Sequence, residues 1–269
     1  MALKLDMEKA FDSMEWNFLL RILSLLGFHP KWINWIHQCI STSSFSIMLD
    51  GAPFGNFKPS RGLRQGDPLS PFLFILGSDI LSRLIFKEEQ KGLLHGIKIS
   101  SRCPSISHLL FADDVMIFSR ANSREATSIM SCLSTYSKWS GQCINVAKSS
   151  IFFSKNCRTA SKLAVNNILK LPPIPVKVKY LGLPLFFSRK KQDSFLEIKD
   201  RILAKISGWK AKFLSQAART TLIKAVVNAI PSYAMSTFML PKSFCLSIDS
   251  PFVSFGGDFH KIKVAVSLC

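Results

Sequence analysis

Residues 108–118 have the sequence His108-Leu-Leu-Phe-Ala-Asp-Asp-Val-Met-Ile-Phe118, which predicts two apolar strands joined by a tight turn. Asp113 and Asp114 lie at the tip of this expected hairpin. Two adjacent carboxylates in an apolar hairpin are costly to pack unless a cation or strong hydrogen-bond donors compensate them. Because Asp also favours turns, an exposed turn that binds nothing is an equally good interpretation of this stretch taken alone.

A third carboxylate ends another expected strand, at the beginning of the chain. Residues Ala2-Leu-Lys-Leu-Asp6 alternate between apolar and charged side chains, which places the two leucines on one face and Asp6 on the other. Hard Mg²⁺ prefers carboxylate oxygens, and two such ions about 3.5–4 Å apart can clamp a phosphoryl transfer. Asp6, Asp113 and Asp114 are the minimum set of ligands that such a site requires, so the sequence indicates a candidate site for two Mg²⁺ ions.

The segment between these carboxylates, Ser60-Arg-Gly-Leu-Arg-Gln-Gly-Asp-Pro-Leu-Ser-Pro71, combines glycines with basic side chains. The glycines allow close approach of the backbone, and Arg61 and Arg64 offer hydrogen-bond donors to phosphate. Asp67-Pro68 is expected to start a helix as its N-cap and first residue. A turn followed by a helix cap explains the glycines and the aspartate, but it leaves Gln65 and the two arginines unexplained.

Elsewhere, the pattern before residue 171 mixes helices and strands, and the pattern after residue 175 is mostly helical. Helices are expected over residues 16–26 and after Pro30, and a strand over residues 45–49 leads into an Asp-Gly turn. Three prolines within residues 171–175 interrupt the chain. A long helix with an apolar stripe is expected from Phe195 to Phe213, and its basic residues off that stripe are Lys199, Lys205, Lys210 and Lys212.

Composition and charge exclude several classes of protein. The chain has 269 residues, of which 48% are hydrophobic and 19% charged, so a sizeable core is expected. No apolar run reaches the roughly 18 residues of a membrane span, and the charged N-terminus argues against a secretory signal. Seven cysteines without C-x-x-C spacing argue against a zinc site or a disulfide framework. These features fit a reduced intracellular protein of the nucleus or cytoplasm.

The positive charge is concentrated in the second part of the chain. The net charge is +18 in total, with +4 over residues 1–150 and +14 over residues 151–269. Such asymmetry favours contact between the second part and a polyanion, although a solubilising surface would produce the same excess.

Five groups of residues resemble the reverse-transcriptase motifs and occur in the same order as those motifs. They are Leu5-Asp-Met-Glu-Lys-Ala-Phe-Asp12, Arg64-Gln-Gly-Asp-Pro-Leu-Ser-Pro71, Phe111-Ala-Asp-Asp114, Gly141-Gln-Cys-Ile-Asn145 with Lys148, and Tyr180-Leu-Gly-Leu-Pro184. Over residues 2–240 the chain is similar to the polymerase of plant non-LTR retrotransposons of the long interspersed element type, in a truncated form. The resemblance implies an α+β fold: a polymerase palm, with an antiparallel sheet and helices on one face, followed by a mostly helical thumb.

The same resemblance implies roles for particular residues. Asp6, Asp113 and Asp114 would be catalytic and would hold two Mg²⁺ ions, with Asp6 and Asp113 as the principal ligands. Phe11 would act as a steric gate against a nucleotide 2′-hydroxyl, although a core phenylalanine would also occur there. The other nucleotide-binding residues would be Gln65, Gly66 and Lys148, and the residues that contact nucleic acid would be Arg61, Arg64, Tyr180, Gly182, Lys199, Lys205, Lys210 and Lys212.

Some of these residues have a structural interpretation as well. A solvated surface lysine would explain Lys148, and plain core packing would explain the hairpin residues 180–184. Asp12 is expected to belong to a capping box, Asp12-Ser-Met-Glu15, that starts the helix at Trp16.

The resemblance also implies an organisation and a set of substrates. Residues 1–185 would form the palm, with fingers missing or incomplete, residues 186–250 a basic helical thumb, and residues 251–269 a divergent tail. The partners would be an RNA template, a DNA primer, deoxynucleoside triphosphates and a polypeptide that supplies the fingers. The chain by itself is then expected to have little or no activity. An inactive nucleic-acid-binding relic and a splicing factor similar to intron maturases remain alternatives, whereas Phe11 and the run at residues 64–66 argue against a viral RNA polymerase.

Overall fold

The computed structural model describes residues 1–175, 178–185, 195–208 and 214–248. The chain folds into two compact units, Met1–Pro175 and Val176–Cys269. The division follows directly after the three prolines of residues 171–175, as the break in the sequence pattern predicts. The expected boundary between palm and thumb, after residue 185, lies ten residues later and stays a prediction about polymerase subdomains.

The first unit is built on an antiparallel sheet whose central strand is the first element of the chain. Strand β1 (Ala2–Glu8) pairs with β5 (Asp114–Phe118), which in turn pairs with β4 (His108–Phe111). On its other side β1 pairs with two short strands, β6 (Cys143–Ile144) and β7 (Ser150–Phe152). The predicted strand at the N-terminus and the predicted strand-turn-strand at residues 108–118 are therefore confirmed, and they are neighbours in one sheet.

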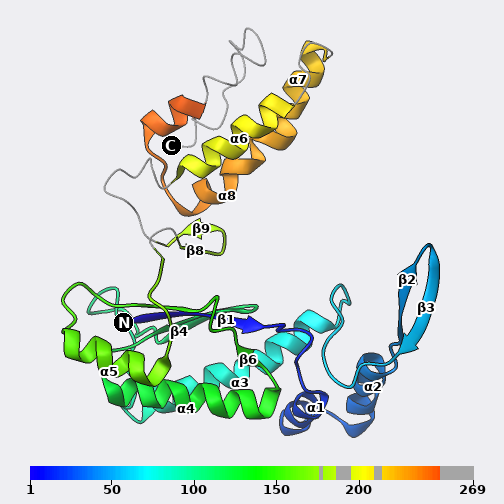
Figure 1. Cartoon of the computed structure of the whole chain (residues 1–269), viewed down its shortest axis with the longest axis vertical. Coiled ribbons are helices and arrows are strands. Elements are labelled where there is room, and N and C mark those ends of the chain that lie inside the picture. The colour runs from blue at the N-terminus through cyan, green and yellow to red at the C-terminus, as the bar shows by residue number, and fades with distance from the viewer. Residues whose placement is uncertain (176–177, 186–194, 209–213, 249–269) are drawn as a thin grey trace. The chain divides into compact units, whose positions relative to one another are not determined.

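Three helices cover one face of this sheet (Figure 1): α3 (Ser70–Gln90), α4 (Ser123–Ser140) and α5 (Thr159–Leu169). The alternation of β1 explains the arrangement, because Leu3 and Leu5 are fully buried in the core of this unit. Lys4 and Asp6 occupy the intervening positions and point to the opposite face of the sheet. An α+β architecture, with an antiparallel sheet and helices on one face, is what the sequence predicted.

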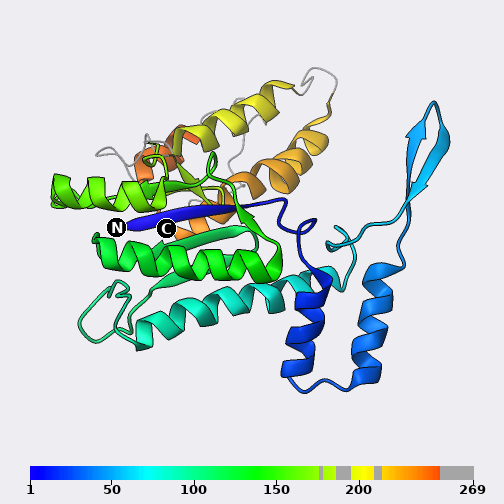
Figure 2. The ribbon, with the colours of Figure 1, turned by 60° about the horizontal axis from the view of Figure 1, so that its bottom comes forward.

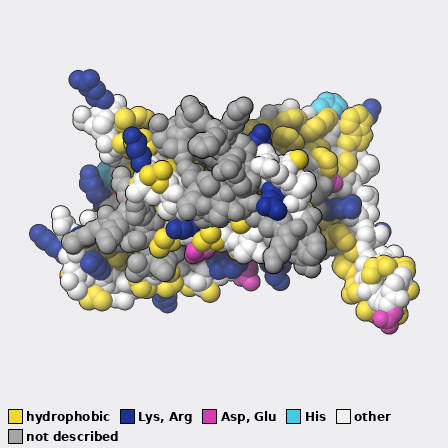
Figure 3. Space-filling model, turned by 90° about the horizontal axis from the view of Figure 1, so that it is seen from above, with side chains coloured by type: hydrophobic (Ala, Val, Ile, Leu, Met, Phe, Trp, Pro, Cys, Tyr) yellow, Lys and Arg dark blue, Asp and Glu magenta, His cyan; other side chains and the backbone are white. Residues whose placement is uncertain are grey.

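A helical pair and a hairpin extend the first unit. Helices α1 (Trp16–Leu25) and α2 (Pro30–Ser41) lie side by side, and strands β2 (Phe45–Leu49) and β3 (Ala52–Phe57) form a hairpin that projects beyond α2 (Figure 2). The Asp50-Gly51 turn joins these strands with both residues at positive φ, as in a type I′ turn. Every residue of the two strands is exposed, and Figure 3 shows hydrophobic side chains gathered on the hairpin.

Two helix starts differ from the predicted ones. Glu15 is the N-cap of α1, and no side chain caps that helix, so the expected capping box at Asp12 is wrong. The N-cap of α3 is Leu69 rather than Asp67. The carboxylate of Asp67 instead accepts a hydrogen bond from Leu69 N at 2.8 Å, which closes one turn of chain before the helix begins.

The second unit is mostly helical, as predicted. A short hairpin of β8 (Lys179–Tyr180) and β9 (Leu183–Pro184) precedes α6 (Leu196–Gly208), α7 (Gln216–Leu222), a π-helical turn η3 (Ile223–Val227) and α8 (Ala229–Thr237); residues 242–248 are also helical. Phe195, Ile202, Val227 and Phe244 belong to a separate core in this unit. The apolar stripe predicted from Phe195 is confirmed as far as Ile206, and its continuation to Phe213 lies outside the described residues. Throughout the described parts of the chain, no helix is both long and apolar enough to span a membrane.

Candidate active site

Strand pairing brings the three predicted carboxylates together from distant parts of the sequence. In the register of β1 and β5, Asp6 lies directly opposite Asp114. The backbone N–H of Met7 donates to the carbonyl oxygen of Asp113 at 3.3 Å, so the turn that carries Asp113 abuts the end of β1. Ala112, in the same turn, has a positive φ of 51°, which is uncommon for a residue with a side chain. Backbone conformations of this kind cluster at functional sites.

The backbone of Asp6 is held from the side opposite β5. Its N–H donates to Ser149 Oγ at 3.1 Å, and its carbonyl oxygen accepts from Asn145 N at 2.8 Å. Asn145 also accepts from the N–H of Lys148 through its side chain, at 3.2 Å. These contacts hold the end of β1 against residues 145–149 and place Lys148 near the carboxylates. In the sequence, only the motif at residues 141–148 indicated that this segment belongs to the site.

The environment of Asp6 disfavours its charged form. Burial is the largest cause that raises the pKa of this carboxyl above its ordinary value of 3.8, and the neighbouring Asp113 and Asp114 raise it further. Lys148 and Lys4 oppose the rise. A carboxylate that is partly desolvated and faces like charges is one that a bound cation would stabilise.

Asp114 differs from the other two carboxylates because it has a cationic partner on the same sheet. Lys4 Nζ donates to Asp114 Oδ1 at 2.9 Å, and the two side chains are 13% and 24% exposed. Lys4 lies two residues before Asp6 on β1, so the ion pair sits beside the candidate site. Lys4 was not predicted from the sequence to be a site residue, although the alternation of β1 places it on the same face as Asp6.

A cavity of about 440 Å³ opens next to Asp6 and Asp113. It collects most of the residues that the sequence analysis assigned to metal and nucleotide, and Asp114 is absent from its lining. The lining residues are Asp6, Met7, Lys9, Ala10, Phe11, Gln65, Gly66, Pro71, Asp113 and Lys148. Residues from four separate motifs thus surround one space, although their positions in the sequence span almost the whole first unit.

Phe11 belongs both to this cavity and to the core. Its ring stacks on Phe74 of α3, with 4.6 Å between the ring centroids and an interplanar angle of 10°. The side chain is half-buried and packs against the main core while it lines the cavity. The two interpretations of Phe11 that the sequence left open are therefore compatible in the structure.

The carboxylates of the cavity fit a divalent cation in their chemistry. Asp6 and Asp113 supply hard oxygen donors to one space. Burial, followed by the neighbouring Asp113 and Asp114, raises the pKa of Asp6, and Lys148 and Lys4 oppose the rise. Over the described ranges, no group of three His, Cys, Asp or Glu side chains is arranged as a metal site. The third predicted ligand, Asp114, is engaged with Lys4 instead.

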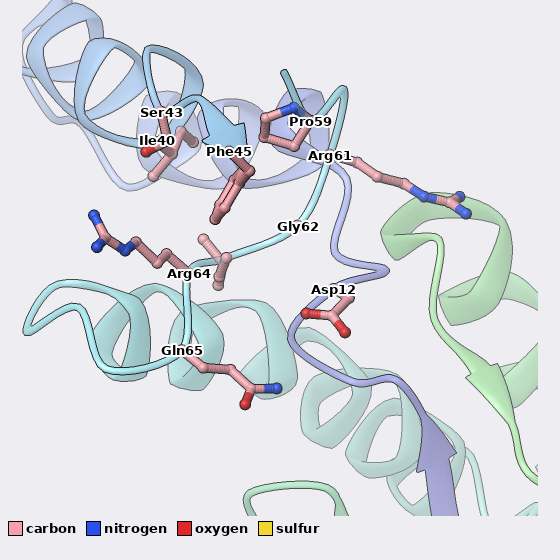
Figure 4. Close-up of a pocket in the computed structure, with 10 residues that line it drawn as sticks. Asp12, Ile40, Ser43, Phe45, Pro59, Arg61, Gly62, Arg64 and Gln65 are labelled. Carbon is pink, nitrogen blue, oxygen red and sulfur yellow. The ribbon is translucent and has the colours of Figure 1, made fainter. Parts of the chain in front are cut away.

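A second cavity, of about 510 Å³, lies on the other side of Gln65 (Figure 4). Gln65 contributes to both cavities, and Asp12 lines the second one instead of capping a helix. The side chains of Arg61 and Arg64 line it as well, but Figure 4 shows them pointing in opposite directions. Arg61 forms an ion pair with Glu15 at 3.4 Å. The two arginines therefore do not converge on one phosphate-sized point.

The remaining predicted contact residues lie in the second unit. Tyr180 ends β8, and Gly182, with a φ of 79°, occupies the turn to β9, so the predicted hairpin is confirmed. Lys199 and Lys205 lie on α6, where Lys199 is half-buried and Lys205 is exposed. Lys210 and Lys212 fall outside the described residues.

This architecture defines a polymerase palm: an antiparallel sheet carries helices on one face, and two carboxylates lie together where the end of β1 meets the β4–β5 turn. The chain belongs to the family described as reverse transcriptase (RNA-dependent DNA polymerase), whose sequence profile matches residues 1–185. Members of this family act on RNA templates and use divalent metal ions.

Individual relatives include proteins of mobile elements. The chain is 24% identical over 263 residues to the uncharacterised 149 kDa protein of transposon TX1 from Xenopus laevis. This alignment covers 94% of the present chain and 19% of the transposon protein. It is 32% identical over 114 residues to the retrovirus-related Pol polyprotein of the type-2 retrotransposable element R2DM from Drosophila melanogaster. This alignment covers 42% of the present chain and 10% of the polyprotein. An uncharacterised mitochondrial protein from Arabidopsis thaliana is 57% identical over 68 residues, or 25% of this chain and 56% of that protein.

The chain therefore spans between about a tenth and just over half of the length of these relatives. Among solved structures, telomerase from Candida albicans in complex with a fragment of telomeric RNA is similar with a TM-score of 0.47 and 13% identity. That similarity covers 96% of this chain and 44% of the telomerase chain.

Proposed function

We propose that this chain is the polymerase part of a retrotransposon reverse transcriptase, which extends a DNA primer by copying an RNA template. One observation carries the proposal: Asp6 of β1 and Asp113 of the β4–β5 turn line one cavity with Phe11, Gln65 and Lys148. A cavity with paired carboxylates on one side and a lysine and an aromatic ring around it suits a deoxynucleoside triphosphate, which has a polyanionic and an apolar end.

In the proposed reaction, the primer 3′-hydroxyl attacks the α-phosphorus of the nucleotide and pyrophosphate leaves. Asp6 and Asp113 would hold two Mg²⁺ ions, and Asp114 would be at most a secondary ligand because Lys4 already pairs with it. Bound divalent ions supply a lowered pKa of the attacking hydroxyl and charge neutralisation at the leaving group. The protein contributes mainly position, since phosphoryl transfer needs little covalent chemistry from side chains.

Around the reacting groups, other residues of the cavity would hold and select the nucleotide. Lys148, which lies near enough to Asp6 to affect its pKa, would face the triphosphate. The ring of Phe11 would occupy the space that a ribonucleotide 2′-hydroxyl needs. Gly66, with a φ of 86° and open space around it, lets the backbone beside Gln65 approach the nucleotide and template closely.

The second unit would contact the template and primer. Residues 176–269 carry a net charge of +10, and Lys199 and Lys205 lie on helix α6 of this unit. The hairpin at Tyr180–Gly182 would contact the primer strand. Sequence would be read by pairing with the template, so this unit needs to recognise only the nucleic-acid backbone.

Primer extension on an RNA template tests the proposal. A version of the chain that carries fingers should add deoxynucleotides to a DNA primer in a reaction that depends on Mg²⁺, and its Asp113→Asn variant should not; the chain by itself is expected to show little or no extension. Asp12→Asn is the matched control, because it makes the same chemical change on an exposed side chain outside the nucleotide cavity. Equal extension by the parent chain and Asp113→Asn would refute the assignment. Binding of the template–primer without any extension would indicate an inactive nucleic-acid-binding protein instead.

A further inference from the structure

We propose that Gln142 is a positioning residue for nucleotide selection: its buried amide holds the backbone at Ala10 and thereby fixes the ring of Phe11 at the cavity. The inference rests on the proposed function, because it takes this cavity to be the nucleotide site. Gln142 itself does not line the cavity, so it would act through its contact with Ala10.

The contacts of Gln142 are specific and fully enclosed. Its side-chain Nε2 donates to the carbonyl oxygen of Ala10 at 2.8 Å, and its Oε1 accepts from Tyr136 OH at 3.0 Å. Gln142 and Tyr136 are each only 2% exposed. Burial raises the pKa of Tyr136 to about 12, so its hydroxyl stays protonated and able to donate. Because a backbone carbonyl can only accept, the NH₂ end of the amide must face Ala10.

The hydrogen bond to Ala10 lies directly beside Phe11. Residues 9–15, between β1 and α1, form turns and irregular backbone, so no helix or strand ladder holds them. The carbonyl oxygen of Phe11 accepts from Leu63 N at 2.7 Å, which anchors the next peptide group from the opposite side. Two successive carbonyl groups are thus fixed by different elements, and together they determine where the Phe11 side chain leaves the backbone.

The residues before Gln142 support the same segment at its far end. The carbonyl oxygen of Ser140 accepts from Glu15 N at 2.8 Å. At Gly141, with a φ of 74°, an added Cβ would lie 2.6 Å from the carbonyl oxygen of Ser13. Residues 140–142 therefore form a close-fitting support for residues 10–15. This contact explains in physical terms why a glycine and a glutamine occur in the motif at residues 141–145.

Replacement of Gln142 by an apolar residue of similar length should release the segment without emptying the space. In Gln142→Met, Ala10 and Tyr136 would keep buried polar groups without their partner, which a folded protein tolerates poorly. The backbone near Ala10 is then expected to shift until other partners are found, and the ring of Phe11 should shift with it. The control is Ser128→Ala, which removes a different side-chain hydrogen bond of the same unit, the one from Ser128 Oγ to Glu88 at 2.8 Å.

The first measurement compares kcat/KM for a deoxynucleotide and the matching ribonucleotide in the fingers-bearing version of the chain. Gln142→Met should lower this discrimination by about fivefold or more, whereas Ser128→Ala should leave the ratio unchanged. Gln142→Glu adds a pH profile, because a protonated Glu can still donate to Ala10 and an ionised one cannot. Its discrimination should fall as pH rises, while that of the parent chain stays constant. An unchanged ratio in both Gln142 variants would overturn the proposal.

The second measurement needs no catalysis, so it separates this inference from the proposed function. In protein labelled with ¹⁵N-leucine, the amide of Leu63 should lose its protection from hydrogen exchange in Gln142→Met. The amides of Leu3 and Leu5 in β1 should keep theirs, which shows that the unit remains folded. If the fingers-bearing version with the parent sequence extends no primer, the proposed function fails and this exchange result alone decides whether Gln142 positions the segment. Retained protection of Leu63 in a folded Gln142→Met would contradict the inference.

Discussion

Phe11 links the hydrophobic core to the candidate nucleotide cavity through a single ring. One face of the ring stacks on Phe74, and the side chain also lines the cavity beside Asp6 and Asp113. The stack restrains the ring without any hydrogen bond, so its position depends on packing and on the backbone of residues 10–11.

The first prediction concerns the size of this side chain. Phe11→Val should open space at the cavity and raise ribonucleotide incorporation, because the smaller side chain no longer fills the region next to the nucleotide 2′ position. Loss of the stack should also cost about 2–3 kcal/mol of stability. Phe74→Leu is the control, since it removes the same stack but leaves Phe11 in the lining. Unchanged sugar discrimination in Phe11→Val would make Phe11 a core residue only.

A second prediction concerns the ion pair between Lys4 and Asp114. Lys4→Met should destabilise the first unit by about 1–2 kcal/mol, because a partly buried carboxylate loses its cation; this is more than exposed pairs contribute and less than fully buried ones. The double variant Lys4→Met with Asp114→Asn should recover most of that loss. Urea denaturation of the four proteins in a double-mutant cycle measures the coupling. A Lys4→Met protein as stable as the parent would show that the pair contributes nothing measurable.

Individual residues could be predicted from the sequence to different extents. The proximity of Asp6 and Asp113 follows from motifs that predict two strand ends. It is confirmed by the hydrogen bond from Met7 N to the carbonyl oxygen of Asp113 and by the cavity that both side chains line. Asp12 was misassigned because a pattern of Asp and Glu at capping-box spacing does not require that the side chain turns back to its own helix. The role of Gln142 was not predictable, since a glutamine gives no periodic signal of burial.

At the scale of elements, strand β4 is connected to helix α3 by a half-buried histidine. His108 Nε2 lies 2.6 Å from Ser82 Oγ on α3, and its Nδ1 lies 3.0 Å from Ser107 Oγ. Burial lowers the pKa of His108 below its ordinary value of 6.5, and Glu89 opposes that shift in part. The neutral imidazole is therefore the form that the folded unit prefers.

A third prediction is that acid weakens this connection. Because the folded pKa is below the unfolded one, the unfolded chain binds more protons as pH falls through about 6.5. The contribution of His108 to stability is thus complete above that pH and is lost on acidification. His108→Gln keeps hydrogen-bonding groups but cannot titrate there, so it should show a smaller loss of stability between about pH 7.5 and about pH 5.5. Identical pH dependence of parent and variant by urea denaturation would exclude this role.

The elements themselves were largely predictable where the sequence has a strong period or a defined turn. The alternation of β1 and the Asp50-Gly51 turn gave correct strands, and the stripe after Pro30 gave α2. The predicted N-cap of α3, Asp67, lies two residues before the observed N-cap, Leu69. Asp67 closes a separate turn whose sequence has the same signature as a helix cap. The short strands β6 and β7 depend on pairing with β1, a contact distant in sequence that local patterns do not encode.

At the scale of the whole molecule, the second unit carries a net charge of +10 on 94 residues and the first unit +8 on 175 residues, so the second unit is the more densely charged. The division after Pro175 follows the proline-rich break in the sequence. A sequence of this kind predicts where a chain divides, because prolines end regular structure and cores form on either side.

A fourth prediction concerns binding of a template–primer duplex by the complete chain. With about four to six phosphate contacts, a plot of log affinity against log salt concentration should have a slope of about −3 to −5 and little dependence on base sequence. Changing the exposed residues Arg201 and Lys205 of α6 together to Gln should reduce the slope by up to about two. The equivalent change at Lys31 and Lys138, which are exposed on helices of the first unit, should not alter it. A salt-independent affinity would make the basic residues an ordinary solvated surface.

The proposed function requires above all that Asp6 and Asp113 together form a divalent-cation site. Titration of the chain with Mn²⁺, followed by the electron paramagnetic resonance signal of the free ion, tests this claim without requiring catalysis. Asp6→Asn and Asp113→Asn should each weaken Mn²⁺ binding by more than about tenfold, which corresponds to about 1.4 kcal/mol, because each removes one of the two carboxylates that line the cavity. Asp12→Asn should bind Mn²⁺ like the parent chain. Parent-like binding by folded Asp6→Asn and Asp113→Asn would contradict the account.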